Sequence, residues 1–165
     1  MQCLAAYNQG VHHFQWVDLE VLVEEGETLA QCIEWVLASS PAAGAEEWLF
    51  SDSSGLPSYL KGEYVSTEEL MSYALALPEV DQSNWDAYRA ICDYMGQAVS
   101  PESFEESYLG DVEPAEYVES YYHENGEVPD YLACYVDWEA MARDWELNGD
   151  LIAVDGLLFN GHSLR

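Results

Sequence analysis

The chain has 165 residues, of which 32 are Asp or Glu and only four are Lys or Arg, so its formal charge at pH 7 is −28. Hydrophobic residues make up 49% of the sequence, which excludes a disordered acidic tail. Four basic residues cannot release the counterions of a phosphate backbone, which excludes direct binding of nucleic acid.

The N-terminal residues predict a β-hairpin. Residues 2–7 and 11–19 have the pattern of two strands around Asn8-Gln9-Gly10, a short turn in which Gly can adopt a positive φ. Residues 47–51 are a candidate for a third strand. We therefore expect a small antiparallel sheet in this part of the chain.

Helix-start signals recur through the rest of the sequence. Thr28 and Ser66 each begin a capping-box pattern, and Ser100 precedes Pro101 in the order expected for an N-cap and a first helical residue. The apolar spacing after these and similar signals predicts a helix that starts at Ser100 and helices over residues 28–38, 66–77, 83–95, 113–124 and 137–147.

The end of the chain predicts a second hairpin. Residues 151–154 and 157–159 flank Asp155-Gly156, which is the strongest short hairpin signal in the sequence. Residues 129–136 are compatible with either a helix or a strand.

Together these elements indicate an α+β fold. Because each part has too few residues for a large core, we expect an elongated chain of three small domains: an N-terminal domain of a small sheet plus helix (1–64), a central helical domain (65–101), and a C-terminal domain of helices plus a small antiparallel sheet (102–165). These segments hold ten, six and sixteen acidic residues against one, one and two basic ones. All three are therefore acidic.

No pattern of catalysis or metal binding stands out. So many carboxylates offer acid–base pairs that no one pair is informative, and the common nucleophile, phosphate-loop and zinc-protease motifs do not occur. Cys3, Cys32, Cys92 and Cys134 are far apart, so we expect buried free thiols, no metal and no cofactor. Without a signal-peptide pattern or an apolar run of about eighteen residues, we expect a cytoplasmic protein with no membrane contact.

The acidic residues are most regularly spaced between Ser100 and Glu127. No Lys or Arg occurs between Arg89 and Arg143, so these acids cannot form the ion-pair lattice of an ordinary exposed helix. A helix over residues 113–124 would place apolar and acidic residues on opposite sides. The apolar side holds Ala115, Tyr117, Val118, Tyr121 and Tyr122, and the acidic side holds Glu113, Glu116, Glu119 and Glu124.

Three explanations of the charge compete: solubility in high salt, binding of a small cationic ligand, and binding to a protein whose own site is basic. The last is favoured, because a salt-adapted surface does not require six Trp and twelve Tyr. Carboxylates could take the place of phosphates in a protein site that is built for DNA. B-DNA carries one charge per about 1.7 Å of its axis, so 28 charges correspond to about 48 Å of duplex, or about 14 base pairs. The candidate DNA-mimic surface comprises Glu24, Glu25, Glu27, Glu46, Glu47, Glu68, Glu69, Asp86, Asp93, Glu102, Glu105, Glu106, Asp111, Glu113, Glu116, Glu119, Glu124 and Glu127.

Short sequence pieces, in order over nearly the whole length, carry a family resemblance. They are Tyr7-Asn8 with Gly10 and Trp16, Glu46-Glu47-Trp48 with Asp52, Glu63-Tyr64 with Ser66 and Glu69-Leu70, and then Tyr121-Tyr122, Gly126, Val128-Pro129, Tyr135, Asp137, Ala142-Arg143-Asp144, Leu147 and Gly149. With these pieces the chain resembles the ArdA-type antirestriction proteins. The sequence departs from the family pattern at His12-His13 and at Trp138, which leaves the range of targets open.

The resemblance implies a non-enzymatic DNA mimic in a bacterial host. Such a protein occupies the DNA-binding groove formed by the specificity and methyltransferase subunits of type I restriction–modification enzymes, and so protects incoming plasmid, transposon or phage DNA. The alternative target is another DNA-binding protein, such as a nucleoid protein or a CRISPR effector. The resemblance also implies three domains along a curved molecule and a homodimer joined through the C-terminal domains.

The resemblance further implies an antirestriction motif with possible dimer contacts, comprising Tyr135, Asp137, Arg143, Asp144 and Leu147. Arg143 and Asp144 admit two interpretations. They could bridge to other acids and fix the dimer contact, or they could act directly in antirestriction. The structural interpretation is favoured.

Overall fold

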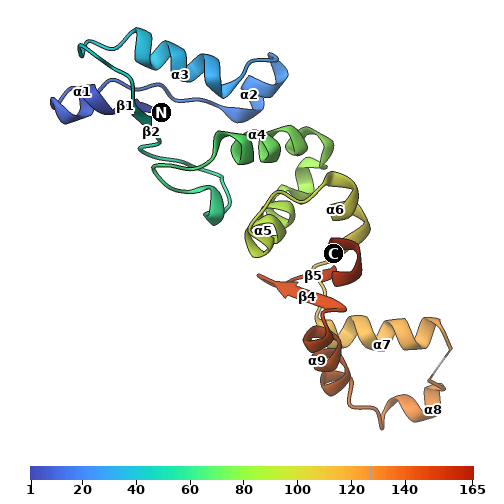
Figure 1. Cartoon of the computed structure of the whole chain (residues 1–165). Helices are drawn as coiled ribbons and strands as arrows, with labels where there is room; N and C mark the ends of the chain where they lie inside the picture. Colours follow the sequence, from blue (N-terminus) through green and yellow to red (C-terminus); the bar gives the residue numbers. More distant parts are fainter. Residues whose placement is uncertain (127) are drawn as a thin grey trace. The chain divides into compact units, whose positions relative to one another are not determined.

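The computed structural model describes residues 1–126 and 128–165 and divides the chain into two compact units, Met1–Ala98 and Val99–Arg165 (Figure 1). Helices dominate both units, and each unit also holds a small antiparallel sheet. This arrangement confirms the α+β class. The division into three domains at residues 64 and 101 stays a prediction.

The first unit consists of short elements. They are, in chain order, β1 (Gln2–Cys3), α1 (Leu4–Asn8), α2 (Leu19–Glu24), α3 (Leu29–Ala38), β2 (Trp48–Leu49), the 3-10 helix η1 (Ser58–Leu60), α4 (Thr67–Ala76), the 3-10 helices η2 (Leu77–Glu79) and η3 (Gln82–Asn84), and α5 (Trp85–Met95). Strand β1 pairs antiparallel with β2, so the third predicted strand is the sheet partner of the first.

The N-terminal hairpin prediction is wrong. Strand β1 ends at Cys3, and the chain then forms α1 instead of continuing as a strand. Leu and Ala are strong helix formers, so Leu4-Ala5-Ala6 favours this helical turn locally. The segment that was expected to be the second strand still runs beside β1, because the backbone N–H of Cys3 donates to the carbonyl oxygen of His13 at 3.1 Å.

The helix-start predictions are confirmed. The Thr28 hydroxyl accepts from the backbone N–H of Gln31, and the Gln31 side chain accepts from the backbone N–H of Thr28 at 2.7 Å, which completes the capping box of α3. The Ser66 hydroxyl caps α4 by accepting from the backbone N–H of Glu69. Ser100 likewise caps the first helix of the second unit.

Two clusters of small or aromatic side chains stabilise the first unit. Cys3, Ala6 and Val36 are fully buried in one cluster between the sheet and α3. Tyr73 of α4 and Tyr88 of α5 stack with ring centroids 5.6 Å apart and are both buried. Helix α2 also packs against α4, so residues that were assigned to the predicted first and second domains are in contact.

The second unit packs helices against a three-stranded sheet. Its elements are α6 (Pro101–Ser107), β3 (Tyr108–Gly110), α7 (Pro114–Glu124), α8 (Asp130–Ala133), α9 (Trp138–Asn148), β4 (Leu151–Val154), β5 (Leu157–Asn160) and the 3-10 helix η4 (Gly161–Leu164). The strand order is β3-β5-β4. The predicted hairpin is β4 and β5, and both turn residues, Asp155 and Gly156, have positive φ. Strand β3 was not predicted, and the ambiguous segment 129–136 contains the short helix α8.

The core of this unit lies between α7, α9 and the sheet. Val118 of α7, Ala142 of α9 and Leu158 of β5 are buried in one cluster. A second group joins α6 to the sheet: Phe104 is 1% exposed, and its ring lies 5.4 Å from that of Tyr108. Each unit therefore has a hydrophobic core of its own.

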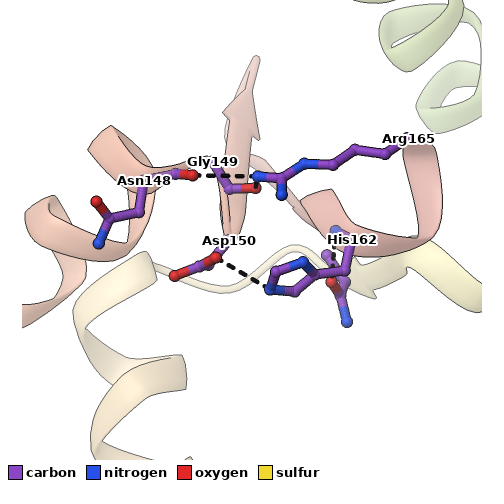
Figure 2. Close-up of polar contacts among 6 residues, drawn as sticks. Asn148, Gly149, Asp150, His162 and Arg165 are labelled. Carbon is purple, nitrogen blue, oxygen red and sulfur yellow. Dashed lines mark hydrogen bonds and ion pairs between the residues drawn. The ribbon is translucent and has the colours of Figure 1, made fainter.

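The C-terminal residues hold the end of α9 (Figure 2). Nη2 of Arg165 donates to the carbonyl oxygens of Asn148 and Gly149, both at 3.1 Å. Nε2 of His162 lies 3.0 Å from Oδ1 of Asp150. Carbonyl groups at a helix C-terminus carry partial negative charge. The positively charged side chain of Arg165 therefore stabilises the C-terminal end of α9.

Candidate functional site

Most of the predicted DNA-mimic acids lie on the surface. Of the eighteen, fifteen are exposed, Asp93 and Glu119 are half-buried, and Glu127 lies outside the described residues. Acidic residues in the first turn of a helix face the positive end of the helix dipole, so several of them stabilise the elements that carry them. These residues are Glu68 and Glu69 of α4, Asp86 of α5, Glu102 of α6 and Glu116 of α7.

Each unit carries the same charge. Residues 1–98 and 99–165 both hold sixteen acids against two Lys or Arg, a formal charge of −14 each. In the described part of the chain, the only ion pair between an acid and an Arg or Lys joins Asp86 to Arg89 at 2.6 Å. Most surface carboxylates are thus left without a positive neighbour.

Helix α7 has the two sides that its sequence predicts. Val118 is fully buried, whereas Glu113, Glu116 and Glu124 are exposed. Two residues deviate from the simple division. Glu119 is half-buried beside His123, with 3.8 Å between the carboxylate and Nε2, and Tyr121 on the apolar side is 40% exposed.

Asp93 differs from the other candidate acids because it makes contacts within the protein. Its carboxylate accepts from the backbone N–H of Tyr59 at 3.1 Å, which ties α5 to η1. Desolvation pushes the pKa of this carboxyl upward, but hydrogen bonds from Ser58 and Tyr59, together with nearby Lys61, outweigh it and hold the pKa below its ordinary value. Asp93 therefore helps to hold the first unit together.

Replacing Asp93 with Asn should lower the free energy of unfolding by about 1 kcal/mol at pH 7, because neutral hydrogen bonds replace charge-assisted ones. Since the folded-state pKa is depressed, the advantage of wild type is present above the ordinary Asp pKa of about 4 and disappears as the pH falls through the folded-state value. Urea unfolding across this range measures the difference. Glu34→Gln, at an exposed site in the same unit, should show no such dependence, and a D93N deficit that persists at low pH would contradict the assignment.

All five residues of the predicted antirestriction motif are exposed, and one of them also caps a helix. Tyr135 and Leu147 are 83% and 79% exposed, and Arg143 and Asp144 are exposed between them in the sequence. Asp137 is exposed as well, and it caps α9 by accepting from the backbone N–H of Ala140. Among the described side chains that of Arg143 makes no ion pair, so its bridge to other acids stays a prediction.

Two apolar residues that precede the motif in the sequence are exposed as well. Tyr131 and Leu132 of α8 are 74% and 43% exposed. Because residues 129–136 are compatible with either a helix or a strand, their sequence does not predict which side chains are exposed. Their neighbour Cys134 is also exposed, which corrects the expectation of four buried thiols; Cys3, Cys32 and Cys92 are buried.

The described residues offer little for other chemistry. No three His, Cys, Asp or Glu side chains among them gather as a metal site requires. His13 does not lie on a strand. Its Nε2 atom lies 3.0 Å from the carbonyl oxygen of Val36, and its ring stacks on that of Trp35. Within residues 1–126 and 128–165, none of the helices has the length and apolar character that crossing a membrane requires.

Two small units with dense, unpaired surface carboxylates suit a protein that binds a basic site. A family model described as Antirestriction protein (ArdA) matches residues 1–159. The chain belongs to the ArdA family. This finding confirms the resemblance and indicates an antirestriction role. No curated protein matches the chain. The matched ArdA residues end before His162 and Arg165, so the side-chain contacts of these two residues in Figure 2 lie beyond the matched region.

Proposed function

We propose that this ArdA family member is a non-catalytic DNA mimic that competes with duplex DNA for the binding groove of type I restriction–modification enzymes. The observation that carries the proposal is the exposure of fifteen candidate acids with almost no basic neighbours. A formal charge of −14 per unit matches that of about 24 Å of B-DNA. The target surface would be the basic groove of the specificity and methyltransferase subunits in a bacterial cytoplasm, with mobile-element DNA as the beneficiary.

Competition for a labelled DNA duplex tests the proposal. The protein should displace the duplex from a purified type I methyltransferase, and displacement should weaken steeply as salt is raised from about 50 to about 200 mM, because both ligands rely on the same charges. No displacement at the lower salt concentration would overturn the proposal. Displacement of DNA from a nucleoid protein or CRISPR effector, but not from the methyltransferase, would reassign the target.

We further propose that the chain forms a homodimer through the surface of α8 and α9. Four exposed apolar or aromatic side chains support this assignment: Tyr131, Leu132, Tyr135 and Leu147. Exposed apolar side chains, in a unit whose other surface is strongly acidic, mark the residues that lose least charge hydration on association. Arg143 is an exposed residue of α9 and would neutralise acids of the second copy.

Leu147→Glu should weaken the homodimer by about 30-fold or more, because it removes an apolar contact and brings like charges together across a symmetric interface. Light scattering after size-exclusion chromatography measures the dimer fraction against concentration. Leu75→Glu is the matched control, since Leu75 is an exposed leucine of α4 in the other unit. Equal dimer fractions for L147E and wild type would contradict the proposal.

Added salt should strengthen the dimer by screening self-repulsion, the opposite of its effect on competition with DNA.

A further inference from the structure

The first unit contains a cavity that the acidic surface does not explain. Its volume is about 310 Å³, at the lower end of the range of about 300–1,000 Å³ that small-molecule pockets occupy. The lining is mainly apolar and aromatic and comes from Met1, the start of α2 with the residues before it, α3, the segment from Phe50 to Gly62 that includes η1, and α4 with η2. Its apolar and aromatic members include Trp16, Leu29, Phe50, Leu60, Leu70 and Tyr73.

Three carboxylates accompany this apolar lining. Asp18, Glu20 and Asp52 all line the cavity and all are exposed, so they border it on the solvent side. No Lys, Arg or His occurs among the lining residues. The positively charged group there is the α-ammonium of Met1, which donates to the carbonyl oxygen of Gln15 at 2.8 Å, and burial lowers its pKa.

We propose that this cavity is a binding site for a small amphiphilic organic cation, with an aromatic or aliphatic body in the apolar space and an ammonium group beside Asp18, Glu20 and Asp52. This site is separate from the DNA-mimic surface and does not depend on it. An anion of the same size would meet the field of a unit with charge −14, and a neutral molecule would leave the carboxylates unused.

Trp16 supports the choice of a cation. The indole is 63% exposed although it lines an apolar cavity, so a ligand at the mouth could cover it. A cation over an indole face gains a cation–π attraction as well as the attraction of nearby carboxylates. Oδ1 of Asp18 already accepts from the backbone N–H groups of Glu20 and Val21, which fixes this carboxylate at the start of α2.

A matched pair of probes tests the site on the full chain. Naphthalen-1-ylmethylammonium has the apolar body and the charge, and naphthalen-1-ylmethanol is its neutral analogue. Titration calorimetry at about 150 mM salt, where weak surface attraction is screened, should show saturable binding of one cation per chain. The alcohol should bind at least about five-fold more weakly, the effect of one nearby charge pair in water.

Variants distinguish the cavity from the rest of the acidic surface. Glu20→Gln should weaken cation binding by about five-fold and leave binding of the alcohol unchanged. Glu24→Gln is the matched control, because Glu24 lies on the same helix but does not line the cavity. Ser53→Trp places a bulky side chain at a half-buried lining position and should abolish binding of both probes.

Three results would overturn the proposal. One is the absence of saturable cation binding to the wild-type protein. Another is an equal loss of affinity in the Glu20→Gln and Glu24→Gln variants, which would indicate attraction to the acidic surface in general. The third is unchanged cation binding to a folded Ser53→Trp variant, as judged by its circular dichroism, because the ligand would then occupy another place.

Discussion

Simultaneous replacement of Glu102, Glu105, Glu113 and Glu116 by glutamine should weaken competition with duplex DNA by about 30-fold, while each single replacement should weaken it by about two- to three-fold. All four residues are exposed, and none of them makes an ion pair in the described part of the chain. A partner that reads charge density meets many equivalent groups, so no single carboxylate should dominate.

Fluorescence anisotropy of a labelled duplex bound to a type I methyltransferase measures this loss. The quadruple variant should also show a shallower dependence on salt, because fewer charge contacts form. Replacing Gln97 and Ser120 by Ala provides a control that changes exposed polar groups without changing charge. Complete loss of competition on one single replacement would contradict a distributed surface and would favour a localised site.

Phe104→Ala should lower the stability of the second unit by about 3–5 kcal/mol, because it removes a ring from a filled core. Phe104 is 1% exposed, and its ring lies 5.4 Å from that of Tyr108 and 6.4 Å from that of Phe159. A loss of this size is comparable to the whole stability of a small domain. We therefore expect α6, β3 and β5 to open together.

Hydrogen exchange read by mass spectrometry separates the two units. In the Phe104→Ala variant, peptides from residues 99–165 should exchange much faster, whereas the buried helices α4 and α5 should keep their wild-type protection. Tyr131→Ala is the control within the same unit, since Tyr131 is 74% exposed and its removal leaves no cavity. Equal acceleration throughout the chain would show that the two units do not unfold separately.

The sequence was most informative where a structural feature is completed by neighbouring residues. Thr28 and Gln31 are three residues apart, and the side chain of each accepts a hydrogen bond from the backbone N–H of the other. Asp155 and Gly156 are adjacent and supply both positive φ values of their turn. Strand β3 has no such local signal, because it forms by pairing Tyr108 with Phe159 from the other end of the unit. Two- and three-residue strands lie below the length at which periodicity distinguishes a strand from a helix.

The candidate surface shows the same limit. Charge spacing predicted correctly that Glu113 and Glu116 would be exposed and that Val118 would face the core. It could not predict that Asp93 binds the backbone of Tyr59, a partner 34 residues away. It also could not reveal the cavity, whose lining comes from five separate stretches of chain. Local patterns predict exposure, but contacts between distant residues depend on packing.

The distribution of thiols has a practical consequence for studying this protein in solution. Three of the four cysteines are buried in the first unit, and Cys134 is exposed directly after α8. A maleimide fluorophore should therefore couple to the native chain at a single place without mutagenesis. Its emission would report whether a second copy covers the neighbouring aromatic side chains.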